Sequence, residues 1–254
     1  MTKKTTFQLF LAFLGLSLCQ TTAAQISLGF RGGILITSID KSPLEDGEPK
    51  PENIPGFQIA VPVEIGIGAL FAIQPEIMIG THGGRQSTNN DVTLLGIRTV
   101  TSAEIKYKIT TLEIPVLAKL KFGSDVLKFH VLAGPSLGFG FNGKSNSETN
   151  LTSTFADGTV LLDQNTKDEF DAKFVKDGFK ADAVEADEFA VSKINFNVHF
   201  GAGLSVNLGS PNLFLDARYM LGMNDLRPEA DGDTKEISYK SKRIGVSVGI
   251  MFPL

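Results

Sequence analysis

The stretch from Gly56 to Thr81 constrains the fold most strongly, because apolar residues alternate there with small or polar ones through two successive segments. Residues of one parity share one face of a β-strand, so each segment has one apolar face. The apolar positions are Phe57, Ile59, Val61, Val63, Ile65 and Ile67, then Phe71, Ile73, Pro75, Ile77 and Ile79. Each stripe covers ~11 residues, which exceeds an ordinary globular strand and matches a bilayer core when the strand is tilted. The stretch therefore predicts a membrane-spanning β-hairpin.

The same alternation recurs along the chain and predicts six further strands, at residues 25–37, 105–122, 127–141, 194–208, 213–223 and 243–254. The phase changes near Thr110 and Thr111, which indicates a β-bulge. Turns of about 3 to 4 residues alternate with connections of about 18, 22, 51 and 16 residues, a pattern typical of bacterial outer-membrane barrels. We therefore expect an all-β fold, an eight-stranded antiparallel transmembrane up-and-down β-barrel with short periplasmic turns and long extracellular loops.

Parity alone does not decide which face points outward, so a soluble periplasmic lipocalin-like ligand-binding barrel is the structural alternative. The polar face is dominated by small residues, which suits the crowded interior of a small barrel, whereas the apolar face is bulky. A Lys or Arg on the lipid face costs about 2 to 4 kcal/mol at mid-bilayer. The strand charges share the inward parity: Arg31, Glu64, Glu76, Glu113, Lys119, Lys128, Asp216, Arg218 and Arg243. We expect these charges to form an interior salt-bridge network, with Glu64 and Glu76 facing Arg or Lys from neighbouring strands.

Residues 1–24 have the organisation of a signal peptide, which would leave residues 25–254 as the barrel domain. Lys3 and Lys4 precede an apolar run from Phe7 to Leu18, and small residues stand before Gln25. Cys19 suggests the alternative of a lipoprotein, but Leu18 is bulky where lipoprotein processing requires a small residue. Cleavage would leave no cysteine, so neither a disulfide nor a thiolate metal site is expected.

The charge balance excludes one class of partner. The net charge is -4 and no basic patch or basic helix is evident, so nucleic-acid binding is not expected.

Two segments resemble a known family. The sequences Leu112–Lys119 (LEIPVLAK) and His130–Gly138 (HVLAGPSLG) are similar to the signature of PorT-like outer-membrane β-barrel proteins, and Gly29–Gly33 (GFRGG) and Phe71–Glu76 fit it as well. The resemblance implies an outer-membrane location. The namesake of the family is implicated in protein export and the maturation of secreted proteases. No residue matched here carries that role, so the resemblance implies fold and location alone.

The C-terminal segment Ser247–Leu254 resembles the terminal strand that the barrel-assembly machinery recognises. A polar residue is followed by Gly249 and then by apolar residues at the antepenultimate and last positions. The resemblance implies that this machinery is a partner during biogenesis.

Enzymatic candidates are few, although some small outer-membrane barrels modify lipids. Such chemistry needs a nucleophile with an adjacent base. His82, placed at the upper end of its strand, could meet Ser87, but an ordinary rim histidine is the simpler interpretation. His130 and His199 point inward at different heights, which favours interior hydrogen bonds over a shared metal. Glu64 and Glu76 could act as paired carboxylates, but inward charges are more often structural. We expect no catalytic, cofactor or metal site.

The connection at residues 142–192 is an acidic extracellular loop in this interpretation, an excursion without paired strands. It holds eleven acidic residues against five lysines. Its acidic clusters could gather Ca²⁺, although no spacing resembles an EF-hand: Asp163, Asp168, Glu169 and Asp171, then Asp182, Glu185, Asp187 and Glu188. Loops on rigid scaffolds often carry function. We therefore expect a non-enzymatic protein of envelope structure, binding or secretion, which contacts outer-membrane lipid and another envelope or secretion protein; a lipid-modifying barrel enzyme is the alternative.

Overall fold

The structure is a computed structural model that describes residues 25–44, 48–231 and 237–254. The expected signal peptide, with Cys19, lies outside the described residues. These residues form ten strands and one short 3-10 helix: β1 (Ile26–Ser42), β2 (Ile54–Ile67), β3 (Phe71–Leu94), β4 (Ile97–Gly123), β5 (Leu127–Phe155), β6 (Val160–Val175), η1 (Ala181–Ala183), β7 (Glu188–Ser192), β8 (Ile194–Asn207), β9 (Asn212–Gly222) and β10 (Ser238–Pro253). No helix in these ranges is long and apolar enough to cross a membrane.

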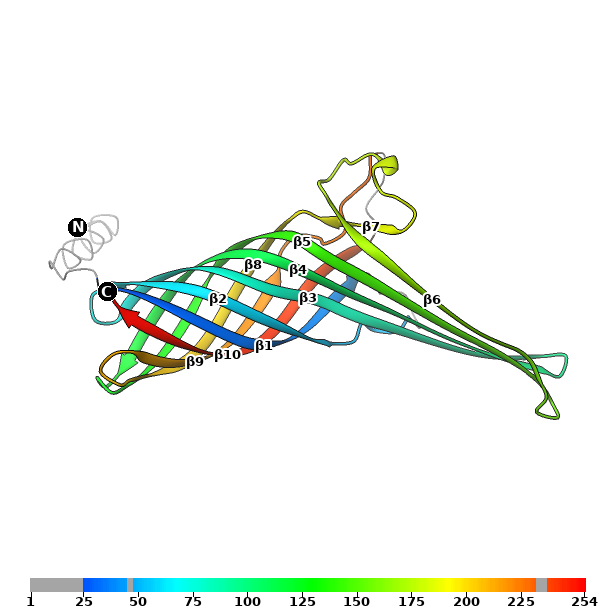
Figure 1. Cartoon of the computed structure of the whole chain (residues 1–254), viewed down its shortest axis with the longest axis horizontal. Helices are drawn as coiled ribbons and strands as arrows, with labels where there is room; N and C mark the ends of the chain where they lie inside the picture. The colour runs from blue at the N-terminus through cyan, green and yellow to red at the C-terminus, as the bar shows by residue number, and fades with distance from the viewer. Residues whose placement is uncertain (1–24, 45–47, 232–236) are drawn as a thin grey trace, which may run out of the picture.

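Eight of the strands close into a tilted ring in which every neighbouring pair is antiparallel (Figure 1). The order is β1-β2-β3-β4-β5-β8-β9-β10, and β10 pairs with β1 to close it. Closure leaves no strand edge unpaired around the ring. The predicted bulge is confirmed, because the β4–β5 register shifts between Thr110 and Thr111.

The two faces of the ring are chemically opposite, as the alternation predicts. The interior side chains are largely polar and buried, whereas the exterior carries exposed apolar side chains on each of the eight strands. These include Phe30 and Ile34 (β1), Phe57 and Ile59 (β2), Ile73 and Ile77 (β3), Ile114 and Val116 (β4), Phe129 and Val131 (β5), Phe196 and Phe200 (β8), Leu213 and Leu215 (β9), and Ile244 and Val246 (β10). A soluble barrel has the reverse arrangement, so the lipocalin-like alternative is wrong.

Three ring strands continue far beyond the ring at one end. The outer parts of β3, β4 and β5, together with β6, form a four-stranded antiparallel sheet that extends away from the ring (Figure 1). We call residues 86–106 and 144–171 the projection. The end of the ring that carries the projection is called the loop end, and the opposite end is called the turn end. β3 and β4 are joined there by a two-residue turn, Leu95–Gly96, in which both residues have positive φ.

This geometry corrects two expectations. The Ser-, Thr- and Asn-rich segment after residue 84 is strand and not a loop, and residues 142–192 contain the end of β5, β6, η1 and β7 rather than an excursion without paired strands. The expected connection lengths of about 22 and 51 residues are wrong for the same reason. Both faces of the projection meet solvent, so its strands lack the apolar period that reveals a half-buried strand.

Candidate functional site

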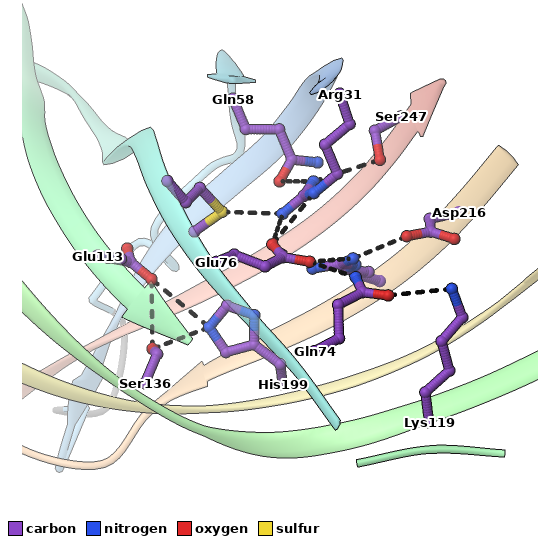
Figure 2. A network of polar contacts seen from close by, with 12 residues as sticks. Arg31, Gln58, Gln74, Glu76, Glu113, Lys119, Ser136, His199, Asp216 and Ser247 are labelled. Carbon is purple, nitrogen blue, oxygen red and sulfur yellow. Dashed lines mark hydrogen bonds and ion pairs between the residues drawn. The ribbon is translucent and has the colours of Figure 1, made fainter. Parts of the chain in front are cut away.

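A network of buried polar side chains fills the ring (Figure 2). It is organised in three groups that follow one another from the turn end toward the loop end. Every charge predicted to face inward is buried or largely buried, except Lys128, which is half-buried near the turn end. The network is therefore the first place to test the candidate residues.

Glu76 on β3 is the centre of the middle group. Arg218 on β9 donates two hydrogen bonds to its carboxylate, at 2.8 and 3.0 Å, and Arg31 on β1 donates from Nη2 at 2.8 Å and from Nε at 3.2 Å. β3 and β9 are four steps apart in a ring of eight strands. The pair of Glu76 and Arg218 therefore spans the full width of the lumen.

Arg218 also continues the network along its own strand. It donates to Asp216 Oδ2 at 2.7 Å, and the other carboxylate oxygen of Asp216 lies 2.6 Å from His130 Nε2. Gly203 on β8 leaves room for this contact, because a Cβ there would lie 2.6 Å from His130 Nε2 and 2.7 Å from Asp216 Oδ1. Close packing of these two side chains thus requires glycine at this position.

Glu64 forms the group nearest the turn end. Lys119 and Lys121 on β4 donate to its two oxygens at 2.9 and 2.5 Å. Lys119 also donates to Gln74, whose amide nitrogen donates to Glu76 at 2.6 Å. Glu64 and Glu76 therefore face Lys and Arg, as predicted, and Gln74 joins their groups (Figure 2). The expectation that these partners come from neighbouring strands is wrong, because they lie on strands two or four steps away across the ring.

Glu113 on β4 is the centre of the group nearest the loop end. Arg243 on β10 donates to both carboxylate oxygens, at 2.6 and 3.1 Å, and β4 and β10 are again four steps apart in the ring. His82 and His199 reach the same carboxylate with Nε2, at 3.2 and 3.5 Å. A second ion pair thus crosses the lumen at another level.

These two crossing pairs are evidence against an open pore through the ring, because their side chains occupy the lumen. An eight-stranded ring encloses only about enough space for its own side chains. Here that space is occupied by the side chains of the two crossing pairs and of Lys119. Each of these residues is no more than 5% exposed. We interpret the interior network as a structural filling.

His82 differs from the expectation. It is 1% exposed, inside the ring, and its Nε2 lies 2.8 Å from Thr111 Oγ1, so the rim interpretation is wrong. Ser87 is five residues further along the same strand and belongs to the projection, where it is opposite Glu104. Residues an odd number apart point to opposite faces of a strand, so His82 and Ser87 do not meet.

Ser136, His199 and Glu113 form an arrangement in the described interior that resembles a catalytic triad. Ser136 Oγ lies 2.9 Å from His199 Nε2 and donates to Glu113 at 3.4 Å. In a triad the serine and the acid bind different ring nitrogens. Here both approach Nε2, and Nδ1 has no hydrogen-bond partner among the described atoms. The group is fully buried and lacks the geometry for nucleophilic catalysis.

Acidic clusters do not form a metal centre in the described part of the chain. No group of three or more His, Cys, Asp or Glu side chains there is placed to hold a metal ion. Asp163, Asp168 and Glu169 lie along the exposed strand β6, and Glu169 pairs with Lys144. The alternative of a Ca²⁺ site in the loop therefore has no structural support.

The far end of the projection carries a cluster of exposed apolar side chains. This apolar tip comprises Leu94, Leu95, Phe155, Val160, Leu161 and Leu162, with exposures between 43% and 93%. Nearby, Arg98 donates hydrogen bonds to Asp91, and these bonds with the positive charge lower the pKa of Asp91 below its usual range. Apolar groups this exposed at the end of a polar sheet make the tip a candidate contact surface.

Sequence reasoning missed the apolar tip and the neutral members of the interior network, such as Gln74 and Ser136. One signal for the tip was present: Asp157–Gly158, between segments rich in Thr and Leu, is a strong hairpin turn pair. The neutral members have the inward parity, but parity does not identify their partners.

Comparison with known proteins identifies the family. The model of the outer membrane protein beta-barrel domain matches residues 19–227, and no curated protein matches the chain. Among solved structures, the attachment invasion locus protein Ail of Yersinia pestis is 12% identical over 90% of this chain and 99% of its own, with a TM-score of 0.35. Neisserial surface protein A is 11% identical over 88% and 96%, with a TM-score of 0.33. The outer membrane protease OmpT of Escherichia coli is 8% identical over 92% and 99%, with a TM-score of 0.40.

Likenesses this low carry no argument about activity, and conclusions rest on the family match and on the geometry of the ring. The match covers most of the chain and agrees with the closed ring, the polar interior and the apolar exterior. The chain belongs to the outer membrane protein beta-barrel domain family, and the protein is located in the outer membrane.

Proposed function

We propose that this protein is a non-enzymatic binding protein, whose ring anchors it in the outer membrane and whose projection binds another envelope or secretion protein. The apolar tip carries the proposal. Its six side chains are exposed at the end of a sheet that is otherwise rich in Ser, Thr, Asn and charged residues. Exposed apolar clusters with polar surroundings are typical of protein interaction sites.

The strand edges of the projection support a protein partner. From residue 86 onward β3 pairs only with β4, and up to residue 170 β6 pairs only with β5. Unpaired edges offer main-chain groups to a strand of another chain. A partner that covers the tip could therefore also extend the sheet.

The orientation of the ring is part of the proposal. The apolar exterior suits contact with lipid, and transmembrane barrels have short turns on the periplasmic side and longer segments outside. We place the turn end in the periplasm and the projection outside the cell. β10 closes the ring against β1, which suits a terminal strand delivered by the barrel-assembly machinery.

The resemblance to PorT-like proteins favours a secretion partner within this proposal. Its two main segments pair side by side, from Glu113 opposite Gly138 to Lys119 opposite Leu132. They supply Glu113, Lys119, His130 and Ser136 to the interior network. These matched residues support the ring, so a secretion role would depend on surfaces outside the matched segments.

The experiment that tests the binding role removes apolar character from the tip without disturbing the ring. The double variant Leu95→Asn and Leu161→Ser keeps the fold, because both side chains are exposed and asparagine tolerates the positive φ of Leu95. Cross-linking in intact cells, followed by mass spectrometry, should recover a specific partner with the native chain and lose it with the variant.

A matched control is Leu44→Ser, which removes an exposed leucine outside the projection. It should retain the partner. A heat-dependent shift in gel mobility verifies that each ring is folded. Equal partner recovery from the tip variant and the native chain would contradict the proposal.

The non-enzymatic part of the proposal has a separate test. Cells that lack the protein should have the same lipid A and phospholipid profile by mass spectrometry as cells that contain it. A lipid species that disappears with the protein and returns with the native chain would favour the lipid-modifying alternative.

A further inference from the structure

A pocket opens at the loop end of the ring, and the binding role proposed for the projection does not involve it. The ends of β1, β3, β4 and β10 form part of its wall, and β7 with the segments around residues 179 and 226–230 forms the rest. Its volume is about 380 Å³, within the range of roughly 300–1,000 Å³ typical of small-molecule sites. The pocket is therefore large enough to hold a small molecule.

The pocket ends where the filled interior of the ring begins. Ile109 lines the pocket and lies opposite His82 in the β3–β4 register. His82 belongs to the group around Glu113, whose ion pair with Arg243 crosses the lumen. The geometry therefore suits a closed binding site rather than the entrance of a channel.

Main-chain hydrogen bonds join the separate segments of the pocket wall. The amide of Ser192 at the end of β7 donates to Leu226 O at 2.7 Å, and the amide of Leu226 donates to Tyr239 O at 2.7 Å. The amide of Asp231 donates to Phe179 O at 2.9 Å. The wall is therefore fixed before any ligand arrives, which reduces the ordering cost of binding.

Aromatic side chains are concentrated in the lining. Tyr107, Tyr239, Phe179 and Phe189 all line the pocket, which gives it two of the three tyrosines of the chain. Tyr107 and Phe189 form an edge-to-face pair with ring centroids 5.8 Å apart. Contact with aromatic faces and edges stabilises a bound ring beyond the apolar area that it removes from water. The wall therefore favours an aromatic ligand.

The charged side chains of the lining are already paired. Arg85 pairs with Glu52 and Glu104, Lys41 pairs with Glu48, and Arg227 has a partner as well. A charged ligand would leave water without gaining a free counter-charge, and such a transfer is costly. The pocket therefore favours an uncharged ligand over an anion or a cation.

We propose that this pocket binds a small uncharged aromatic molecule, whose flat ring packs against Tyr107 and Phe189. A carboxylate of the same shape binds about tenfold or more weakly, because its charge loses water and gains no partner. A saturated molecule of the same size lacks the ring contacts and binds about threefold to tenfold more weakly.

Fluorotyrosine labelling tests the proposal in the native chain, because each tyrosine reports a different place. Tyr107 and Tyr239 line the pocket, whereas Tyr219 lies opposite Ile244 and Phe200, which are exposed on the outer face of the ring. In lipid nanodiscs, a naphthamide should shift the fluorine resonances of Tyr107 and Tyr239 in a saturable manner. Tyr219 reports uptake of the probe by lipid, and single Tyr-to-Phe variants assign the three resonances. A shift confined to Tyr219 would overturn the proposal.

Matched probes test the class of ligand in the same titration. The naphthamide should bind about tenfold or more tightly than the corresponding naphthoate, and about threefold to tenfold more tightly than its saturated analogue. Equal affinity of the amide and the acid would overturn the preference for an uncharged ligand. Equal affinity of the naphthamide and its saturated analogue would overturn the preference for an aromatic one.

Two matched truncations separate this site from the apolar tip. Phe189→Ala removes one ring of the aromatic pair and should weaken naphthamide binding about tenfold. Phe155→Ala makes the same change at the tip and should leave naphthamide binding intact. Gel mobility before and after heating verifies the ring, and a native-like Tyr239 resonance verifies the pocket wall. Unchanged affinity in a folded Phe189→Ala variant would overturn the assignment of the pocket, whereas loss of the protein partner with Phe155→Ala concerns the tip alone.

Discussion

The ring and the projection are built from the same strands, yet different forces stabilise them. Within the ring, β3, β4 and β5 have one face on the charged interior and one apolar face outside. In the projection the same strands continue with most side chains on both faces exposed or half-buried. A chain can therefore change from a half-buried to a solvated sheet without interrupting its hydrogen-bond ladder.

The difference shows what closure contributes. In the ring every strand has two neighbours, and the charges of the three groups are paired with little access to water. In the projection ion pairs such as Glu148 with Lys167 are exposed, and water screens pairs of that kind. Stability should consequently be concentrated in the ring, and recognition surfaces are free to vary outside it.

The largest effect is expected from breaking the central ion pairs with Glu76→Gln. Arg31 would then lose its carboxylate partner and Arg218 would keep only Asp216, and removing one partner of a buried pair costs about 3–5 kcal/mol. Urea unfolding of the protein in lipid bilayers should show this loss.

Glu148→Gln in the projection is the matched control, because it removes a carboxylate from an exposed pair. Its unfolding midpoint should equal that of the native protein. If both substitutions shifted the midpoint equally, the proposed difference between buried and screened pairs would be refuted.

A smaller loss is expected from crowding the network with Gly203→Ala. The new Cβ would lie 2.2 Å from Leu215 O and within 2.7 Å of His130 and Asp216, and overpacking of this kind costs about 1–3 kcal/mol. Gly32→Ala on β1 is the control, since its nearest neighbour would be 3.9 Å away. The same urea titration should separate the two variants, and a native-like midpoint for Gly203→Ala would show that β8 can move to make room.

The sequence predicts the ring much better than the projection, for a physical reason. Alternation reports burial, so it identified the strands, the inward charges and the bulge at Thr110. It carried no information on the solvated strands beyond Gln86, where neither face is buried. It also placed His82 at the rim, because β3 was expected to end at Thr81.

The second limit of prediction from the sequence concerns the partners of side chains that lie far apart along the chain. Parity predicted that Glu76 would face Arg or Lys, but the choice of Arg218 depends on ring closure and on the number of strands between β3 and β9. The pocket at the loop end was not predictable either, since its walls come from segments without any shared sequence period.

The smallest effect on the ring is expected from removing most of the projection. Deleting residues 87–104 and 147–168 and joining each cut with Asn-Gly preserves the pairs Gln86 with Ile105 and Asn146 with Glu169, and Asn-Gly suits a two-residue hairpin turn. The ring keeps its closing pairs and all three groups of the interior network. Its unfolding midpoint and heat-dependent mobility should therefore match those of the full chain, while cross-linking of the partner should be lost together with the tip. A truncated ring that failed to close would mean that the long β4–β5 ladder outside the ring contributes to closure, and the separation between a stable ring and a dispensable projection would then be wrong.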